Sequence, residues 1–134
     1  MIVVDANLIG NLFLKGENTP LAIKVFEKDP DWYAPLLWQS EMRSILTSNF
    51  RYRELSLENA LYIMDEAHRL MMEHERHVSS TTVLDLVRVS KCTSYDCEYV
   101  AMAQDMNLTL VTFDSQVVKE FPRVAVFPID FINH

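Results

Sequence analysis

Residues 2–6 read IVVDA, three consecutive β-branched apolar residues followed by an acid at Asp5. A short apolar run of this kind is typical of a strand buried on both faces in a parallel sheet. Residues 110–114, LVTFD, form a second such run and also end in an acid. Because segments of this kind alternate with helical patterns, we predict an α/β fold, a three-layer α/β/α sandwich with a central, mostly parallel sheet.

Strands and helices are expected to alternate along most of the chain. Strands are predicted at residues 2–6, 31–35, 109–113 and 124–127. Helices are predicted from Asn7 to about Leu14, over 36–49, from Ser56 to about Glu75, from Ser80 to Lys91, from Thr93 to Asn107, and over 115–121.

Length and composition predict a single domain over residues 1–134, since hydrophobic residues make up 49% of the chain and no internal repeat divides it. No apolar run approaches the roughly 20 residues that span a bilayer, so no membrane partner is expected. No basic residue precedes the first apolar stretch, which disfavours a signal peptide. Two cysteines, Cys92 and Cys97, are too few for a disulfide scaffold. These features predict a cytoplasmic protein in a reducing compartment.

The formal net charge of −7 disfavours a polyanionic partner such as nucleic acid. The distribution of the acids matters more than their sum. A metal ion would offset the negative charge of acids that gather around it, so the net charge does not exclude a nucleic-acid partner.

Two acids stand where ligands bind in parallel sheets, beyond the carboxyl ends of strands. Asp5 follows the first predicted strand and Asp114 follows a later one. An aspartate in a turn that caps the next helix is the alternative interpretation of each.

Two further acids have mostly apolar neighbours on their helices. Glu41 shares a face with Leu37, Trp38 and Ile45, which indicates an inward side chain, although a position at the helix rim is the alternative. Asp96 lies three residues after Thr93, the spacing of a capping box. Capping and a site role are compatible there, because the start of a helix can aim an acid at a strand end.

Four acids at one sheet edge would repel one another, and a hard divalent cation such as Mg²⁺ or Mn²⁺ would relieve that repulsion. A water bound to such an ion can attack a phosphodiester. His74 and His77 lack the spacing of the zinc-binding H-E-x-x-H motif, and a histidine near a helix end also suits the helix dipole.

These motifs together resemble the PIN-domain family of metal-dependent ribonucleases, especially its compact VapC-type toxins. The strand ending at Asp5-Ala-Asn7, Pro35 with Glu41, the stretch Thr93 to Ala103 and the closing Thr112-Phe-Asp114 follow the family's motifs in order. The resemblance implies a PIN-like fold, an endoribonuclease and cleavage that leaves a 5′-phosphate and a 3′-hydroxyl.

The resemblance also implies the site. Asp5, Glu41, Asp96 and Asp114 would be both the catalytic acids and the ligands of one or two Mg²⁺ or Mn²⁺ ions. Asn7, Ser44 and Thr112 would orient the acids and the water. Ser44 stands where the family often has asparagine, and serine can donate a hydrogen bond there with less reach.

Residues 49–53, NFRYR, alternate aromatic and basic side chains, a pattern suited to phosphate contact and base stacking. With Arg43 upstream, Arg51 and Arg53 are therefore candidate RNA-binding residues. An ordinary loop between helices with solvated arginines is the alternative interpretation.

The helix after Ser56 has more apolar residues than one face needs, including Leu57, Leu61 and Met64, with Tyr62 and Ile63 beside that stripe. Such a width suggests contact with a partner, and a helix enclosed in a small core is the alternative. The resemblance favours a homodimer and an antitoxin protein that masks the site.

We therefore predict the ribonuclease toxin of a type II toxin–antitoxin pair. The main alternative is a PIN-like module that binds RNA or protein without catalysis. An aspartyl-phosphate phosphatase is disfavoured because position 7 is Asn, where that chemistry usually needs a second acid. A signalling receiver domain is disfavoured because its phospho-acceptor should follow a middle strand and a lysine should follow a late one.

Overall fold

A five-stranded sheet forms the centre of the computed structural model, which describes all 134 residues. Its strand order is β3-β2-β1-β4-β5, and every neighbouring pair is parallel. The predicted α/β fold with a parallel central sheet is thus confirmed. The strands are β1 (Ile2–Val4), β2 (Trp32–Pro35), β3 (Glu75–Arg76), β4 (Leu110–Val111) and β5 (Ala125–Val126).

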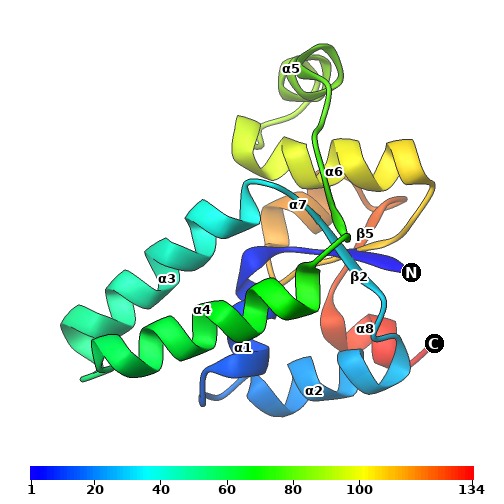
Figure 1. Cartoon of the computed structure of the whole chain (residues 1–134). Helices are drawn as coiled ribbons and strands as arrows, with labels where there is room; N and C mark the ends of the chain where they lie inside the picture. The colour runs from blue at the N-terminus through cyan, green and yellow to red at the C-terminus, as the bar shows by residue number, and fades with distance from the viewer.

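Eight helices connect and cover these strands (Figure 1). They are α1 (Ala6–Phe13), α2 (Thr19–Lys28), α3 (Trp38–Tyr52), α4 (Leu57–Met71), α5 (Ser80–Arg88), α6 (Ser94–Met106), α7 (Ser115–Glu120) and α8 (Pro128–Ile132).

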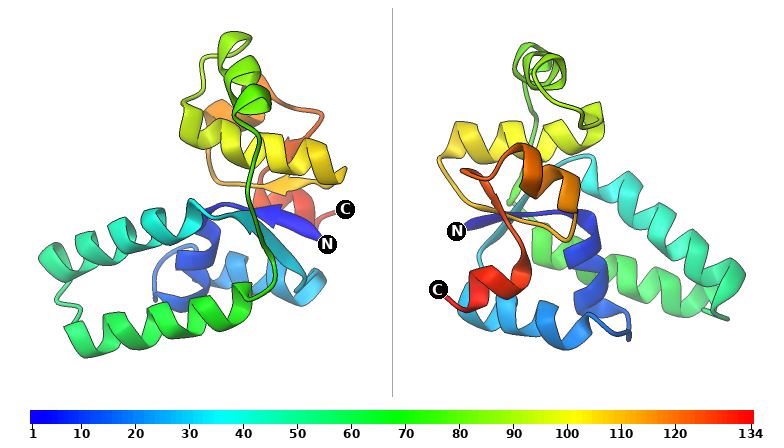
Figure 2. Two further views of the ribbon diagram at one scale, coloured as in Figure 1. Left: turned by 45° about the horizontal axis from the view of Figure 1, so that its top comes forward. Right: turned by 180° about the vertical axis from the view of Figure 1, so that it is seen from behind.

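Helix α6 lies on one face of the sheet, and α1, α2 and α4 lie on the other (Figure 1). Helix α6 is enclosed, because it packs against β1, β2 and β4 on one side and against α5 on the other. Its residues from Tyr99 to Ala103 are all buried, as expected of a helix that is apolar around its circumference. Helices α3 and α4 lie side by side and extend away from the sheet in both views of Figure 2.

One cluster of 28 buried residues forms the core, with Trp32 and Trp38 among its largest fully buried side chains. The prediction of a single domain over residues 1–134 stays a prediction. None of the helices combines the length and the apolar character that crossing a bilayer requires.

Most predicted elements are confirmed, and their differences from the structure are local. The predicted capping residue of α1 was wrong, because Asp5 and not Asn7 accepts the hydrogen bond from the amide of Leu8. The cap of α5 is Ser79 rather than Ser80. Helix α4 ends at Met71, and the short strand β3 follows it where the prediction had continued the helix.

The sheet order reverses beside β1, because the chain proceeds from β1 to β2 and β3 on one side and later to β4 and β5 on the other. This switch point lies between β1 and β4, where Val4 pairs with Val111. The acids Asp5 and Asp114 follow these two strands, so the fold places them at the crevice where α/β sheets bind ligands.

Candidate active site

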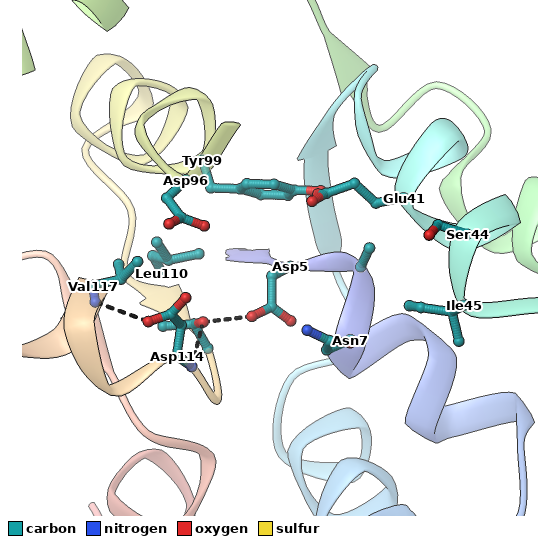
Figure 3. A pocket seen from close by; sticks show the side chains of 12 residues that line it. Asp5, Asn7, Glu41, Ser44, Ile45, Asp96, Tyr99, Leu110, Asp114 and Val117 are labelled. Carbon is teal, nitrogen blue, oxygen red and sulfur yellow. Dashed lines mark hydrogen bonds between the residues drawn. The ribbon is translucent and has the colours of Figure 1, made fainter. Parts of the chain in front are cut away.

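A cavity of about 240 Å³ opens at the carboxyl edge of the sheet, and all four predicted acids line it. Each acid comes from a different place in the fold: Asp5 follows β1, Glu41 is in the first turn of α3, Asp96 is in the first turn of α6, and Asp114 follows β4. Figure 3 shows the carboxylates of Asp5, Asp96 and Asp114 turned toward a shared space, and the Tyr99 side chain extending beside it to the Glu41 carboxylate. The remaining lining residues are Ala6, Asn7, Ser44, Ile45, Tyr99, Leu110, Thr112 and Val117.

Thr112 joins two of the acids through one hydroxyl group. Its side chain is almost completely buried, with 2% of its surface exposed. Its Oγ1 donates a hydrogen bond to Oδ2 of Asp5 and accepts one from the backbone amide of Asp114 at 3.0 Å. A buried hydroxyl with both partners satisfied holds its neighbours in one arrangement, so Thr112 fixes the Asp5 carboxylate relative to the Asp114 backbone.

Asp5 and Asp114 also cap helices, as their alternative interpretation predicted. Oδ1 of Asp5 accepts from the amide of Leu8 at 2.8 Å, and Oδ1 of Asp114 accepts from the amides of Gln116 and Val117 at 2.9 and 3.2 Å. Each cap uses Oδ1, so Oδ2 of Asp114 is left without a protein partner. Capping and lining the cavity are therefore done by the same side chains.

Asp96 combines the two roles that its sequence left open. Oγ1 of Thr93 accepts a hydrogen bond from the Asp96 amide at 3.1 Å, so Thr93 caps α6 as predicted. The side chain of Asp96 lies half-buried at the cavity wall. The start of α6 thus aims this carboxylate at the ends of β1 and β4.

Glu41 is held by Tyr99, a residue whose role the sequence did not reveal. Oη of Tyr99 donates to Oε1 of Glu41 at 2.5 Å. Burial raises the pKa of the Tyr99 phenol far above its usual value, and the nearby charge of Glu41 adds to this, so the hydroxyl remains a donor. Tyr99 lies three residues after Asp96, hence on the same face of α6, and that spacing was the available signal.

Three of the four carboxyl groups resist ionisation. Burial raises the pKa of Asp5 from 3.8 to about 6, against the lowering effect of its bond from Thr112. Burial likewise raises the pKa values of Glu41 and Asp96. Repulsion between neighbouring carboxylates raises these pKa values further: Glu41 acts on Asp5, Asp96 acts on Glu41, and Asp114 acts on Asp96. No lining residue is basic, so only a cation from outside the chain can offset this charge at the wall.

The chemistry of the cavity wall fits a hard divalent cation. No group of three or more His, Cys, Asp or Glu side chains stands close enough together to hold a metal ion. Mg²⁺, however, usually binds one or two carboxylates and keeps several waters, so separated carboxylates around an open cavity suit it. The wall has no cysteine or histidine, the ligands that zinc prefers.

The other predicted site residues fall into two groups. Asn7 and Ser44 line the cavity with the acids. The three arginines do not line it: Arg43 is exposed and lies near Ser40 and Gln39 on its own helix, and Arg51 is exposed near the end of α3. Arg53, which follows α3, lines a neighbouring cavity instead.

An all-parallel sheet with carboxylates gathered at its switch point defines an α/β protein with an acidic site at the carboxyl edge. The sequence matches the family model described as PIN domain over residues 2–126. The chain therefore belongs to the PIN-domain family, whose members are generally nucleases. No protein of curated function matches it.

Three solved structures share the fold over nearly the whole chain. PAE2754 from Pyrobaculum aerophilum has a TM-score of 0.74 at 17% identity and covers 98% of this chain and 93% of its own. FitAcB from Neisseria gonorrhoeae has a TM-score of 0.76 at 15% identity, with coverages of 96% and 99%. A toxin–antitoxin complex from Klebsiella pneumoniae has a TM-score of 0.65 at 19% identity, with coverages of 96% and 98%. At these identities the likeness shows a common fold.

Proposed function

We propose that the chain is an endoribonuclease that hydrolyses RNA phosphodiester bonds with Mg²⁺ or Mn²⁺ held among Asp5, Glu41, Asp96 and Asp114. The observation that carries this proposal is the wall of the acidic cavity, which four carboxylates from separate elements line without a basic side chain. Membership of the PIN-domain family supports it.

One or two such ions would supply an activated water and would hold the phosphate oxygens. The residues of the chain keep the acids in place for that purpose. Thr112 fixes Asp5, and Tyr99 fixes Glu41. The amides at the start of α7 fix one oxygen of Asp114. Asn7 and Ser44, also at the wall, would orient the water or the ion, and the products would carry a 5′-phosphate and a 3′-hydroxyl.

The test is cleavage of structured RNA by the purified chain in Mg²⁺ or Mn²⁺, beside an Asp96→Asn variant. Asp105→Asn is a matched control, because Asp105 is an exposed acid on the same helix and does not line the cavity. We expect the control to cleave like the unmodified chain and Asp96→Asn to lose at least ~100-fold in rate, since metal-binding groups contribute several kcal/mol to such reactions. Equal cleavage by Asp96→Asn would indicate a contaminating nuclease.

We further propose that this nuclease is the cytoplasmic toxin of a toxin–antitoxin pair, that it forms a homodimer and that an antitoxin protein masks its site. One fold relative is a toxin–antitoxin complex. On α4, the large apolar side chains of Leu57, Leu61 and Tyr62 are exposed, which supports a protein partner. Light scattering should give the mass of two 15.6 kDa chains, and a short upstream reading frame for a DNA-binding protein should adjoin the gene.

A binding module without catalysis is the second candidate, favoured by the absence of a ready-made group of three metal ligands. It predicts RNA binding that is the same with and without divalent cations and no cleavage of any RNA offered. Cation-dependent cleavage that Asp96→Asn abolishes would exclude it.

A further inference from the structure

A second cavity, of about 310 Å³, adjoins the acidic one. Asn7 and Ile45 line both cavities, so the two share a wall. The second cavity lies between α1, the loop over residues 14–18 and the C-terminal half of α3. A ligand that reaches the acids from this side must pass over it.

The charge of the second cavity is opposite to that of the first. Lys15 and Arg53 line it, both are exposed, and neither takes part in any of the four ion pairs of the chain. Glu17 is its only acid. On a chain of net charge −7, two unpaired cations beside the acidic cavity give the second cavity a local positive charge that attracts anions.

The rest of the wall suits a nucleobase. Asparagine side chains can both donate and accept hydrogen bonds, as reading a base edge requires, and apolar side chains can cover a base face. Asn49 donates its Nδ2 to the carbonyl of Ile45 at 2.9 Å, which leaves its own carbonyl oxygen available. The asparagines that line the cavity are Asn7, Asn11, Asn18 and Asn49, and its two apolar side chains are Leu14 and Ile45.

We propose that this cavity binds the nucleotide next to the cleaved bond of single-stranded RNA. Lys15 and Arg53 contact its phosphates, and the asparagines contact its base. The volume matches that of small-molecule sites. Lys15 and Arg53 add a local attraction for the RNA backbone beside the acidic cavity. The inference rests on the proposed ribonuclease function and adds where its substrate lies.

The test measures binding of a short fluorescein-labelled single-stranded RNA of mixed sequence to the non-cleaving Asp96→Asn chain over a range of salt concentrations. Adding Lys15→Ala or Arg53→Ala should weaken binding several-fold and lower the slope of log K against log salt by about 0.7 for each phosphate that the variant no longer neutralises. Adding Glu17→Lys should tighten binding, a gain that misfolding cannot produce.

Matched controls are Lys24→Ala on α2 and Arg123→Ala, two exposed basic residues outside both cavities. Both should leave the affinity and the slope unchanged. If Lys15→Ala and Arg53→Ala behave like these controls, or if no RNA binds, the subsite is wrong.

Cleavage assays separate this proposal from the function on which it rests. In the chain with all four acids, Lys15→Ala should raise KM with kcat little changed, because it removes an interaction made equally in the bound and transition states. Normal cleavage by Lys15→Ala and Arg53→Ala would overturn the subsite and leave the ribonuclease function intact. If Lys15→Ala and Arg53→Ala weaken RNA binding but the unmodified chain cleaves no RNA, the result would count against the ribonuclease function and not against the subsite.

Discussion

Replacing Asp5 with Asn should stabilise the metal-free fold while it abolishes RNA cleavage. Burial is the main reason that the pKa of Asp5 rises from 3.8 to about 6. At pH 8 the Asp5 carboxyl group of the folded chain is ionised, although its surroundings favour the neutral acid, and this lowers the stability of the fold. Asn is neutral, and its oxygen can keep the cap to the amide of Leu8.

The size of the effect follows from the pKa of Asp5. The rise from 3.8 to about 6 corresponds to about 3 kcal/mol, at ~1.4 kcal/mol for each tenfold change in acidity. Two losses reduce it: the hydroxyl of Thr112 loses its acceptor, at about 1 kcal/mol, and the start of α1 loses a negative charge, at ~0.5 kcal/mol. The net gain is about 1–2 kcal/mol, or roughly 4–8 °C in Tm for a chain of 134 residues.

Thermal melts in EDTA at pH 8 and pH 5 test this value, with Asp105→Asn as control. The pKa of Asp5 is higher in the folded chain than in the unfolded chain. Protonation of Asp5 therefore stabilises the folded state fully below about pH 4, and this stabilisation is lost as the pH rises through about 6. The advantage of Asp5→Asn should therefore be large at pH 8 and small at pH 5. A variant that melts below the unmodified chain at pH 8 in EDTA would refute the reasoning.

Three further predictions concern the same cavity. Mn²⁺ at about 100 times its Kd should stabilise the unmodified chain by ~2.7 kcal/mol, roughly 10 °C in a thermal melt, and Asp96→Asn should lose most of that shift. Thr112→Val, which removes the donor to Asp5, should lower Mn²⁺ affinity about 10–100-fold in calorimetry. Thr112→Ser should retain the affinity, and an equal loss in both variants would argue against the hydroxyl. Tyr99→Phe should lower Mn²⁺ affinity by a similar factor with the fold intact by circular dichroism, whereas Tyr62→Phe on the surface of α4 should change neither.

The fold was predictable where local signals were strong. Helix α6 begins after the cap Thr93 and ends at Asn107, as predicted, and Asn107 has the left-handed conformation that commonly ends a helix, at φ 55°. Helix α2 was missed, since only Ala22 and Val25 of its residues are buried and its apolar pattern is correspondingly weak. Strand β3 has two residues and depends on its pairing with β2, which no local pattern reveals.

Helix α4 shows why burial was harder to predict than the helix itself. Its pattern grouped Leu57 and Leu61 with Ala67 and Met71 in one apolar stripe. The structure buries Ala67 and Met71 but leaves Leu57 and Leu61 each 57% exposed, because the N-terminal part of α4 extends with α3 beyond the sheet. Which part of a stripe meets the core depends on tertiary contacts and not on periodicity.

Asp5 and Asp114 were predictable from position, because acids that follow parallel strands lie at one edge of the sheet. Glu41 and Asp96 were predicted from their apolar helix neighbours and from the resemblance to the PIN-domain family. All four acids line the cavity, together with Asn7, Ser44 and Thr112. The contact between Tyr99 and Glu41 joins residues 58 apart in the sequence, and the second cavity depends on how closely α1 approaches α3. Such long-range geometry leaves no local mark in the chain.

The most direct measurement of the central claim is an anomalous-scattering map from crystals of the chain soaked in MnCl₂. We predict a manganese peak within the cavity bordered by Asp5, Glu41, Asp96 and Asp114, and its loss in crystals of the Asp96→Asn variant. A map with no peak in that cavity, or an equal peak in both crystals, would contradict the claim that these four carboxylates form a metal site.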